Sequence, residues 1–178
     1  MAPEQLVFPS LIDGYVKGLG PLFTDVTRQR LKAAGLDLQK LPPAINATKM
    51  IGFMEIIAAT AYPELTREEQ LRQLGLAAIR GWQHGLLGSA AAAMIRVIGP
   101  RRALTRLDRA FSTTNNFSRA KTELLGDKEA LVTINDVQDI PTYWQGVFEA
   151  SLELLALEGT VVIDHQVPPE GTFRITWK

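Results

Sequence analysis

Residues 81–117 read GWQHGLLGSAAAAMIRVIGPRRALTRLDRAFSTTNNF, and the periodicity of the chain changes across this stretch. Before it, apolar residues recur at the spacing of helices, and after it they alternate as they do in strands. Gly81, Gly85 and Gly88 follow one another at spacings of four and three, which predicts a narrow seam for a close helix crossing. Gly99 and Pro100 then break the helix, because Pro100 suits the first turn of a new one. We therefore expect this stretch to join a helical half to a sheet half.

The residues before this stretch predict helices with recognisable ends. Thr24 is a typical N-cap, Gly35 a typical left-handed residue after a helix, and Thr66 with Glu69 forms a capping box. The expected helices are Ser10–Leu19 with Ser10 as its N-cap, Asp25–Ala34, Thr48–Ala61, and one from Arg67 towards Leu87 around which the others pack. A further helix is expected over Arg101–Phe111.

The residues after the stretch predict two hairpins separated by one helix. The first hairpin covers residues 117–135, the helix covers Tyr143–Leu157, and the second hairpin covers residues 160–177. In the second hairpin, alternation puts Val161, Ile163, His165 and Val167 on one face. The predicted fold class is α+β, with an N-terminal helical half followed by a β-β-α-β-β four-stranded antiparallel sheet packed on helices. We expect one domain over residues 1–178, with a helical subdomain at about 1–112 and a sheet subdomain at about 116–178.

Composition indicates a folded, reduced, cytoplasmic protein. The chain has 178 residues, no cysteine, 46% hydrophobic and 21% charged residues. Without cysteine, a disulfide scaffold, a thiolate metal site and a cysteine nucleophile are excluded. The first residues lack the basic start and apolar core of a signal peptide, and no apolar run approaches the length of a membrane helix. We therefore expect no membrane partner.

Charge is segregated along the chain although the net charge is zero. Residues 96–121 hold Asp108 and the bases Arg96, Arg101, Arg102, Arg106, Arg109, Arg119 and Lys121. Residues 122–178 are instead rich in acids. Two interpretations remain open: the two segments face each other or are separately solvated, or the basic one binds an anionic partner. Nucleic acid is not expected, because the pI of about 6.7 is close to neutral.

No pattern of catalytic or metal-binding residues stands out. His84 has no second ligand four residues away, and a lone histidine is more often structural than metal-binding. There is no G-x-S-x-G sequence and no glycine-rich phosphate loop after a strand. The asparagines of residues 112–116 are of a kind that usually builds turns. We expect no enzyme activity, no metal and no cofactor.

Binding residues are therefore sought near the basic cluster and the seam. Arginine guanidinium groups bind carboxylates and phosphates through two parallel hydrogen bonds, and the free N–H groups after Gly99 and Pro100 favour anions too. The candidate ligand-binding or partner-binding residues are Trp82, His84, Arg101, Arg102, Arg106, Asn115 and Asn116.

Several segments in order resemble a family of proteins of unknown function, the domain of unknown function 2378 family, which recurs as paralogues in myxobacteria. The matching segments are Leu6–Pro9, Arg30–Asp37, Leu41–Ala44, Tyr62–Leu65, Leu74–Gly75, Ile98–Arg102, Phe111–Phe117 and Tyr143–Gly146. The resemblance covers nearly the whole chain, and it implies a stand-alone single-domain protein without known chemistry.

The order of elements is also similar in shape to haem nitric-oxide/oxygen sensor domains and to four-vinyl-reductase-type ligand-binding domains. That likeness implies a pocket between the helices and the sheet. The haem sensors carry a Tyr-x-Ser-x-Arg triad that this chain lacks, and the vinyl-reductase type often shows cysteines. The sequence favours a non-enzymatic regulatory or signalling module that binds a small molecule. The alternative is an adaptor that forms a homodimer or docks an acidic protein partner through the Arg101–Arg109 helix.

Overall fold

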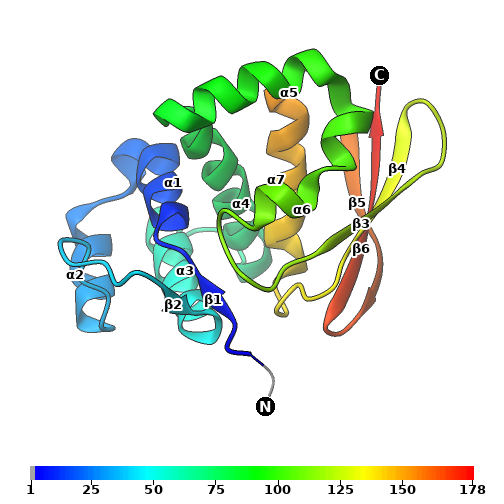
Figure 1. Ribbon diagram of the computed structural model, residues 1–178. Helices are drawn as coiled ribbons and strands as arrows, with labels where there is room; N and C mark the ends of the chain where they lie inside the picture. Colours follow the sequence, from blue (N-terminus) through cyan, green and yellow to red (C-terminus); the bar gives the residue numbers. More distant parts are fainter. Residues whose placement is uncertain (1–2) are drawn as a thin grey trace.

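The structure, a computed structural model, describes residues 3–178, apart from the side chains of Leu86, Leu87 and Asp108. Figure 1 shows a helical part and a sheet, with α5 arching over both. The first half contains β1 (Leu6–Val7), α1 (Ser10–Leu19), the 3-10 turn η1 (Gly20–Leu22), α2 (Asp25–Ala33), β2 (Ile45–Asn46), α3 (Ala47–Ala61) and α4 (Arg67–Gln83). The second half contains α5 (Leu86–Leu104), α6 (Leu107–Phe111), β3 (Ala120–Leu124), β4 (Glu129–Ile134), α7 (Pro141–Leu154), β5 (Gly159–Val167) and β6 (Glu170–Trp177). The α+β prediction is confirmed.

The sheet has the predicted four antiparallel strands, in the order β3-β4-β6-β5. Its apolar face packs against α7, where the rings of Phe148 and Phe173 lie 5.2 Å apart. Val161 is buried as predicted, but His165 and Val167 are exposed. The prediction that they share a face is wrong, because β5 shifts register between Ile163 and His165 and the extra residue interrupts the alternation.

Helix α4 is the helix around which its neighbours pack, as predicted. A Cβ at Gly81 would overlap the backbone of Gly14 on α1, and one at Gly75 would overlap the carbonyl of Tyr143 on α7. These glycines therefore set the close approach of three helices. Gly85 and Gly88 do not join that seam as expected, because both instead face the carbonyl oxygen of Trp82.

The structure corrects several predicted helix bounds. The helix expected over Arg101–Phe111 is interrupted at Thr105 and Arg106, so its first turn belongs to α5 and its end forms α6. The helix expected over Tyr143–Leu157 is α7, which ends at Leu154.

Helix α4 ends at Gln83 instead of running towards Leu87, because Gly85 is extended and starts a new helix. Ser10 does not cap α1, since its hydroxyl donates to the carbonyl of Thr113 instead. The Thr24 and Thr66 caps are confirmed by hydrogen bonds from the amides of Thr27 and Glu69. Glu69 does not reach back to complete the capping box, because its carboxylate accepts from Arg72 and Gln73.

The buried side chains form two hydrophobic clusters. One lies among the helices α1, α2, α3 and α4 and the first turns of α7, and the other lies between α7 and the sheet. Trp144 packs against both clusters. Within residues 3–178, no helix combines the length and the apolar character that crossing a membrane requires.

Candidate functional site

Helix α5 is apolar but poorly covered. It is broken at Gly99, whose φ of 77° lies in the left-handed region, as the sequence predicted. Gly88 and Ala92 are buried, and Ile95 follows on the same face one turn later. Ile95 and Ile98 are only partly buried even though this face is turned to the body of the protein. The protein itself therefore does not complete the apolar contact beneath α5.

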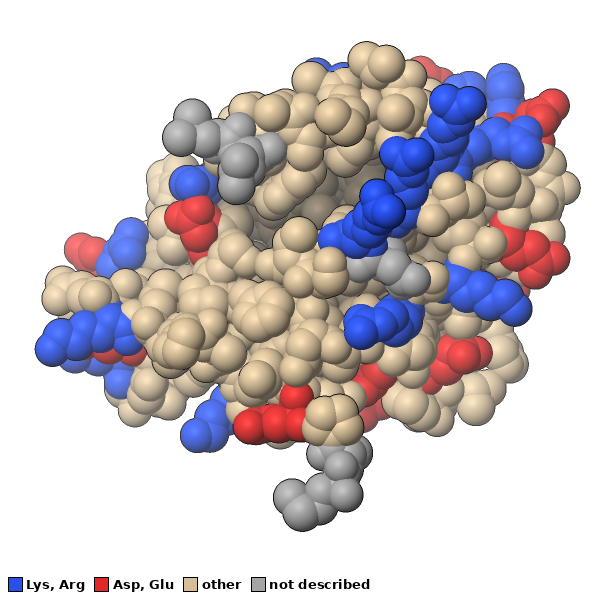
Figure 2. All heavy atoms as spheres, in the orientation of Figure 1, with Lys and Arg blue, Asp and Glu red and all other residues tan. Residues whose placement is uncertain are grey.

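A hollow lies beneath this helix. Figure 2 shows a recess in the surface between the arch of α5 and the segment of α6, at the place where Figure 1 draws α4 and α7 behind them. The position of the hollow agrees with the partial exposure of Ile95. If α5 packed closely on α4 and α7, the side of the helix that carries Ile95 would be buried. The hollow thus borders α5 and α6 on the outside and α4 and α7 behind them (Figures 1 and 2), whereas α7 also packs against the sheet.

Aromatic side chains connect α6, α7 and α1. The ring of Trp144 meets Phe111 of α6 at 5.1 Å and Tyr143 at 5.8 Å, both edge to face. Tyr143 in turn meets Tyr15 of α1 at 6.5 Å. Sequence analysis did not identify Tyr15, Tyr143 or Trp144 as site residues, because Tyr15 lies 128 positions from its partner and no local pattern links them.

Tyr15 and Tyr143 share a buried hydrogen bond between their hydroxyl oxygens at 3.1 Å. Burial raises the pKa of Tyr143 to about 12, although the hydrogen bond from Tyr15 works in the opposite direction. Burial also raises the pKa of Tyr15 well above its ordinary value, and the neighbouring Tyr143 adds to the rise. Both tyrosines are therefore neutral at ordinary pH and contribute a hydroxyl pair, not a charge.

The predicted arginines lie along α5 and α6 and are exposed. Arg101 pairs with Asp127 at 2.5 Å. Arg102 and Arg106, and Arg109 beyond them, have no side-chain partner among the residues that the structure describes. The side chain of Asp108, the one acid in this segment, lies outside the described residues. Figure 2 shows basic side chains in a row beside the hollow.

Several acids of the C-terminal segment pair with bases outside residues 96–121. Arg72 of α4 forms a 2.8 Å pair with Glu149 of α7, and Arg80 forms another 2.8 Å pair with Glu153. The hydrogen bond to Glu149 raises the pKa of Arg72, and the one to Glu153 raises that of Arg80. In the described part of the chain, Arg101–Asp127 is the one ion pair between the basic segment and this acidic segment. The basic row is thus not neutralised by the acids that follow it.

The two predicted asparagines hold the junction between the halves. Asn115 is buried, and its Oδ1 accepts from the amides of Phe117 and Ser118 at 3.1 and 2.7 Å. Asn116 accepts from the amide of Leu6 at 2.8 Å and donates to the carbonyl of Glu4 at 3.0 Å. The side-chain amide of Asn115 thus fixes the turn before β3, and that of Asn116 fixes the N-terminal segment. Their role as binding residues stays a prediction.

The remaining predicted residues, Trp82 and His84, lie at the corner between α4 and α5. Trp82 is half-buried and its carbonyl contacts the backbone of Gly88, whereas His84 is exposed. The structure thus brings Trp82 and His84 together at one end of α5 and the arginines at its other end. Asn115 and Asn116 lie apart from both groups, beside β1.

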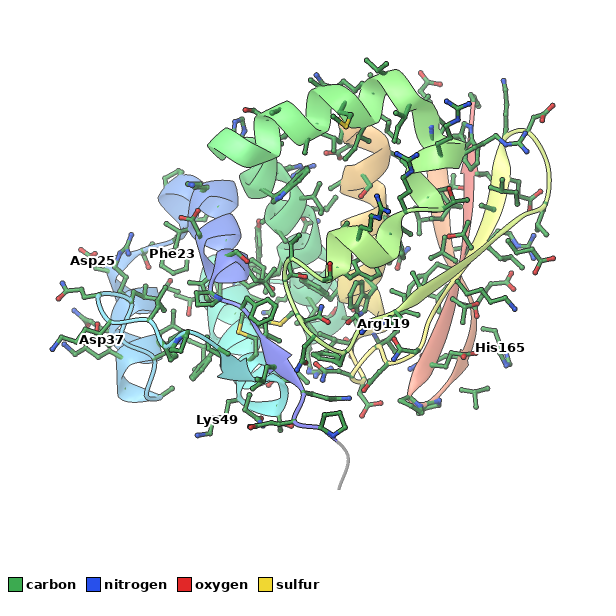
Figure 3. The ribbon with its side chains drawn as sticks, viewed as in Figure 1. Phe23, Asp25, Asp37, Lys49, Arg119 and His165 are labelled. Atoms are coloured by element: carbon green, nitrogen blue, oxygen red, sulfur yellow. The ribbon has the colours of Figure 1, made fainter. Side chains whose placement is uncertain are left out.

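A second depression of 340 Å³ lies between the end of α2 and α3, lined by Ala34, Gly35, Lys49, Gly52, Phe53 and Ile56. Figure 3 shows Lys49, which lines this depression, in the helical part of the molecule. Arg119 and His165, which lies on the outer side of the sheet, are far from it in this view. This depression is open to solvent and lies away from the partly exposed inner face of α5, on which the candidate site is based.

Comparison with known proteins gives one family and one fold. The family model "Protein of unknown function (DUF2378)" matches residues 5–178. No curated relative matches the chain.

Solved H-NOX domains share the fold over almost the whole chain. A variant of Tt H-NOX has a TM-score of 0.74 and 15% identity over 96% of this chain and 95% of its own. An oxygen-binding H-NOX domain related to soluble guanylate cyclases has a TM-score of 0.71 and 16% identity over 95% and 94%. A structure concerned with H-NOX activation has a TM-score of 0.69 and 16% identity over 94% of both chains. Identities this low show the fold alone.

Proposed function

The chain belongs to the family of proteins of unknown function DUF2378, and from that premise we propose that it is a sensor-like regulatory domain, not an enzyme. It binds an apolar small molecule in the hollow beneath α5. The H-NOX fold supports a small-molecule sensing role, since it is shared over nearly the whole length of the chain.

The observation that carries this proposal is the incomplete burial of the inner face of α5. Ile95 and Ile98 remain partly exposed on a helix whose Ala92 and Leu104 are buried. Full burial of an isoleucine side chain is worth about 1.5–3 kcal/mol relative to exposure. A ligand that fills the hollow recovers part of this free energy, and its own apolar surface leaves water at the same time.

Haem is the first ligand to compare with this chain, because one H-NOX neighbour is an oxygen complex and another concerns haem distortion. Haem iron is held by histidine, cysteine, methionine or tyrosine. The chain has no cysteine, and His84 and His165 are both exposed. Within the described residues neither imidazole has a hydrogen-bond partner, whereas metal-binding histidines are normally fixed by one.

The other iron ligands do not fit either. The hydroxyls of Tyr15 and Tyr143 bind each other, and a pKa of about 12 for Tyr143 disfavours the phenolate that iron requires. Met50 and Met54 are buried in the helical cluster, and Met94 is 65% exposed on the outer face of α5. The residues that the structure describes therefore do not suit haem, and the proposed ligand is bound without iron.

A pair of matched substitutions on α5 tests the proposal. Ile95→Ser makes the inner face polar, and Val97→Ser makes the same kind of change on the outer face, where Val97 is 86% exposed. The neutral apolar fluorophore N-phenyl-1-naphthylamine reports binding by its emission. We expect binding to the native chain and to Val97→Ser, and at least tenfold weaker binding to Ile95→Ser. Equal binding to both variants, or none to the native chain, would remove the proposal.

A second candidate function is an adaptor that docks a protein partner. The outer face of α5 favours it, because Met94 and Val97 are 65% and 86% exposed next to the arginines of the same helix. Exposed apolar groups beside a basic row are typical of docking surfaces. Crosslinking tests this alternative with the native chain and with the double variant Met94→Ser/Val97→Ser. Crosslinks formed in a lysate indicate a protein partner, crosslinks formed by the purified chain alone indicate a homodimer, and their absence in both indicates an isolated monomer.

A further inference from the structure

Three arginines form a row beside the hollow (Figure 2), and no described acid pairs with them. Arg102 lies in the last turn of α5, Arg106 in the following turn and Arg109 in α6, and all three are exposed. The helix is interrupted at Thr105 and Arg106, and Figure 2 shows basic side chains in a row on this part of the surface. Among the residues that the structure describes, none of the three guanidinium groups has an acid or a carbonyl partner.

This absence distinguishes the row from the other arginines. Arg67, Arg72, Arg80, Arg101 and Arg174 each form an ion pair of 2.5 to 2.8 Å, and Arg96 donates to the carbonyl of Leu154. The exposed Arg30 on α2 is a further arginine without a described partner, but it is isolated. A cluster of like charges raises the potential around it and attracts anions.

The row also borders apolar surface. Ile98 precedes Arg102 by four residues across the break at Gly99, so the chain between them spans at most about 14 Å. The partly exposed Ile98 thus lies within one small molecule's length of Arg102. A molecule in the hollow meets an apolar wall at one end and positive charge at the other.

We propose that the ligand of this hollow is a free amphipathic acid, with its apolar body beneath α5 and a carboxylate or phosphate at Arg102, Arg106 and Arg109. This inference rests on the proposed function of the hollow and adds the chemical class of the ligand. Guanidinium groups bind both kinds of acid through paired hydrogen bonds, which lysine does not reproduce. Nucleic acid is disfavoured, because the chain has no net charge and the row is short.

Three probes with the same apolar chain test the head group. Dodecanoate, dodecyl phosphate and neutral dodecanol are titrated calorimetrically below the concentrations at which they form micelles. The variants are the triple R102Q/R106Q/R109Q, the triple R102K/R106K/R109K, and R30Q as the control for loss of an exposed, unpartnered arginine. Thermal unfolding of each variant establishes that it is folded.

We expect the native chain and R30Q to bind an acidic probe at least tenfold more tightly than dodecanol. The glutamine triple variant should lose that preference and keep its affinity for dodecanol. The lysine triple variant should retain only part of the preference for the acidic probe. The stronger of the two acidic probes identifies the head group.

The outcomes separate the two proposals. Equal affinity of the native chain for dodecanol and both acids overturns the amphipathic acid and leaves the apolar ligand standing. No binding of any probe overturns both. If polyglutamate binds the arginines and dodecanoate does not, the row serves a protein partner and the inference is wrong.

Discussion

Arg96 donates a hydrogen bond from Nε to the carbonyl oxygen of Leu154 over 2.7 Å, and this bond joins the middle of α5 to the C-terminal end of α7. The carbonyl groups of a last helical turn have no partner within their own helix, so the guanidinium satisfies one of them. Elsewhere α5 is held by its buried residues Gly88, Ala92 and Leu104. The helix is thus an arch fixed at a few points, and the hollow beneath it depends on those points.

Loss of this hydrogen bond should loosen α5 alone. Hydrogen bonds to charged groups contribute about 1.5–3 kcal/mol, so in Arg96→Ala the amides of residues 91–98 should exchange with deuterium about tenfold faster or more. Exchange in α4 should be unchanged, and Met94→Ala, on the exposed face, should leave α5 as it is. Equal protection of α5 in Arg96→Ala and the native chain would contradict the anchoring role.

The glycines of the α4 and α7 crossing should not tolerate a methyl group. A Cβ on Gly75 would overlap the carbonyl of Tyr143, and one on Gly146 would overlap the carbonyl of Arg72. We expect Gly75→Ala or Gly146→Ala to lower the free energy of unfolding by roughly 1–3 kcal/mol. Gly52→Ala, on α3 with no neighbouring atom in reach, should raise it by about 1 kcal/mol. Urea denaturation measures all three, and an unchanged stability of Gly75→Ala would refute the close crossing.

Stability should fall steeply in alkali because of the tyrosine pair. Tyr143 has an ordinary pKa of 10.0 and a pKa of about 12 in the folded chain. The protonated hydroxyl therefore stabilises the fold fully below pH 10, and this contribution is lost as the pH rises towards 12. Urea denaturation of the native chain and Tyr143→Phe at pH 9 and pH 11.5 measures the loss. A native chain that loses no more stability than Tyr143→Phe would contradict the assignment.

Haem should not bind through its iron. Because His84 and His165 are exposed and unpartnered within the described residues, added hemin should show no absorption spectrum of histidine-ligated iron. Any hemin taken up by the apolar hollow should give the same spectrum in the native chain, in His84→Ala and in His165→Ala. A ligand-field spectrum that disappears in one of these variants would show that the residues do accept haem.

Periodicity was sufficient to predict most of the fold. The alternation of Phe173, Ile175 and Trp177 correctly indicated buried positions of β6, and the glycine at position 99 correctly indicated the break in α5. The corner at His84 and Gly85 was missed because no proline marks it. The exposure of His165 was missed because a β-bulge depends on the partner strand and leaves no pattern in its own strand. The short β1 and β2 are too brief to show a period.

The candidate site was predictable only in part. The basic segment that holds Arg102 and Arg106 is evident in the sequence, but their lack of described partners depends on the pairing of Glu149 and Glu153 with α4. That pairing is a tertiary property, as is the meeting of Tyr15 with Tyr143. The partial exposure of Ile95 is likewise invisible in sequence, because an alanine-rich apolar helix is normally buried.

The central claim is tested most directly by locating the site at which a neutral apolar ligand binds. In nitrogen–proton NMR spectra of the native chain with dodecanol, the amides around Ile95 and Ile98 should shift. The indole signal of Trp177, buried in the sheet cluster, should stay in place. Shifts confined to the outer face of α5, or to the depression around Lys49 and Gly52, would contradict a ligand site beneath α5.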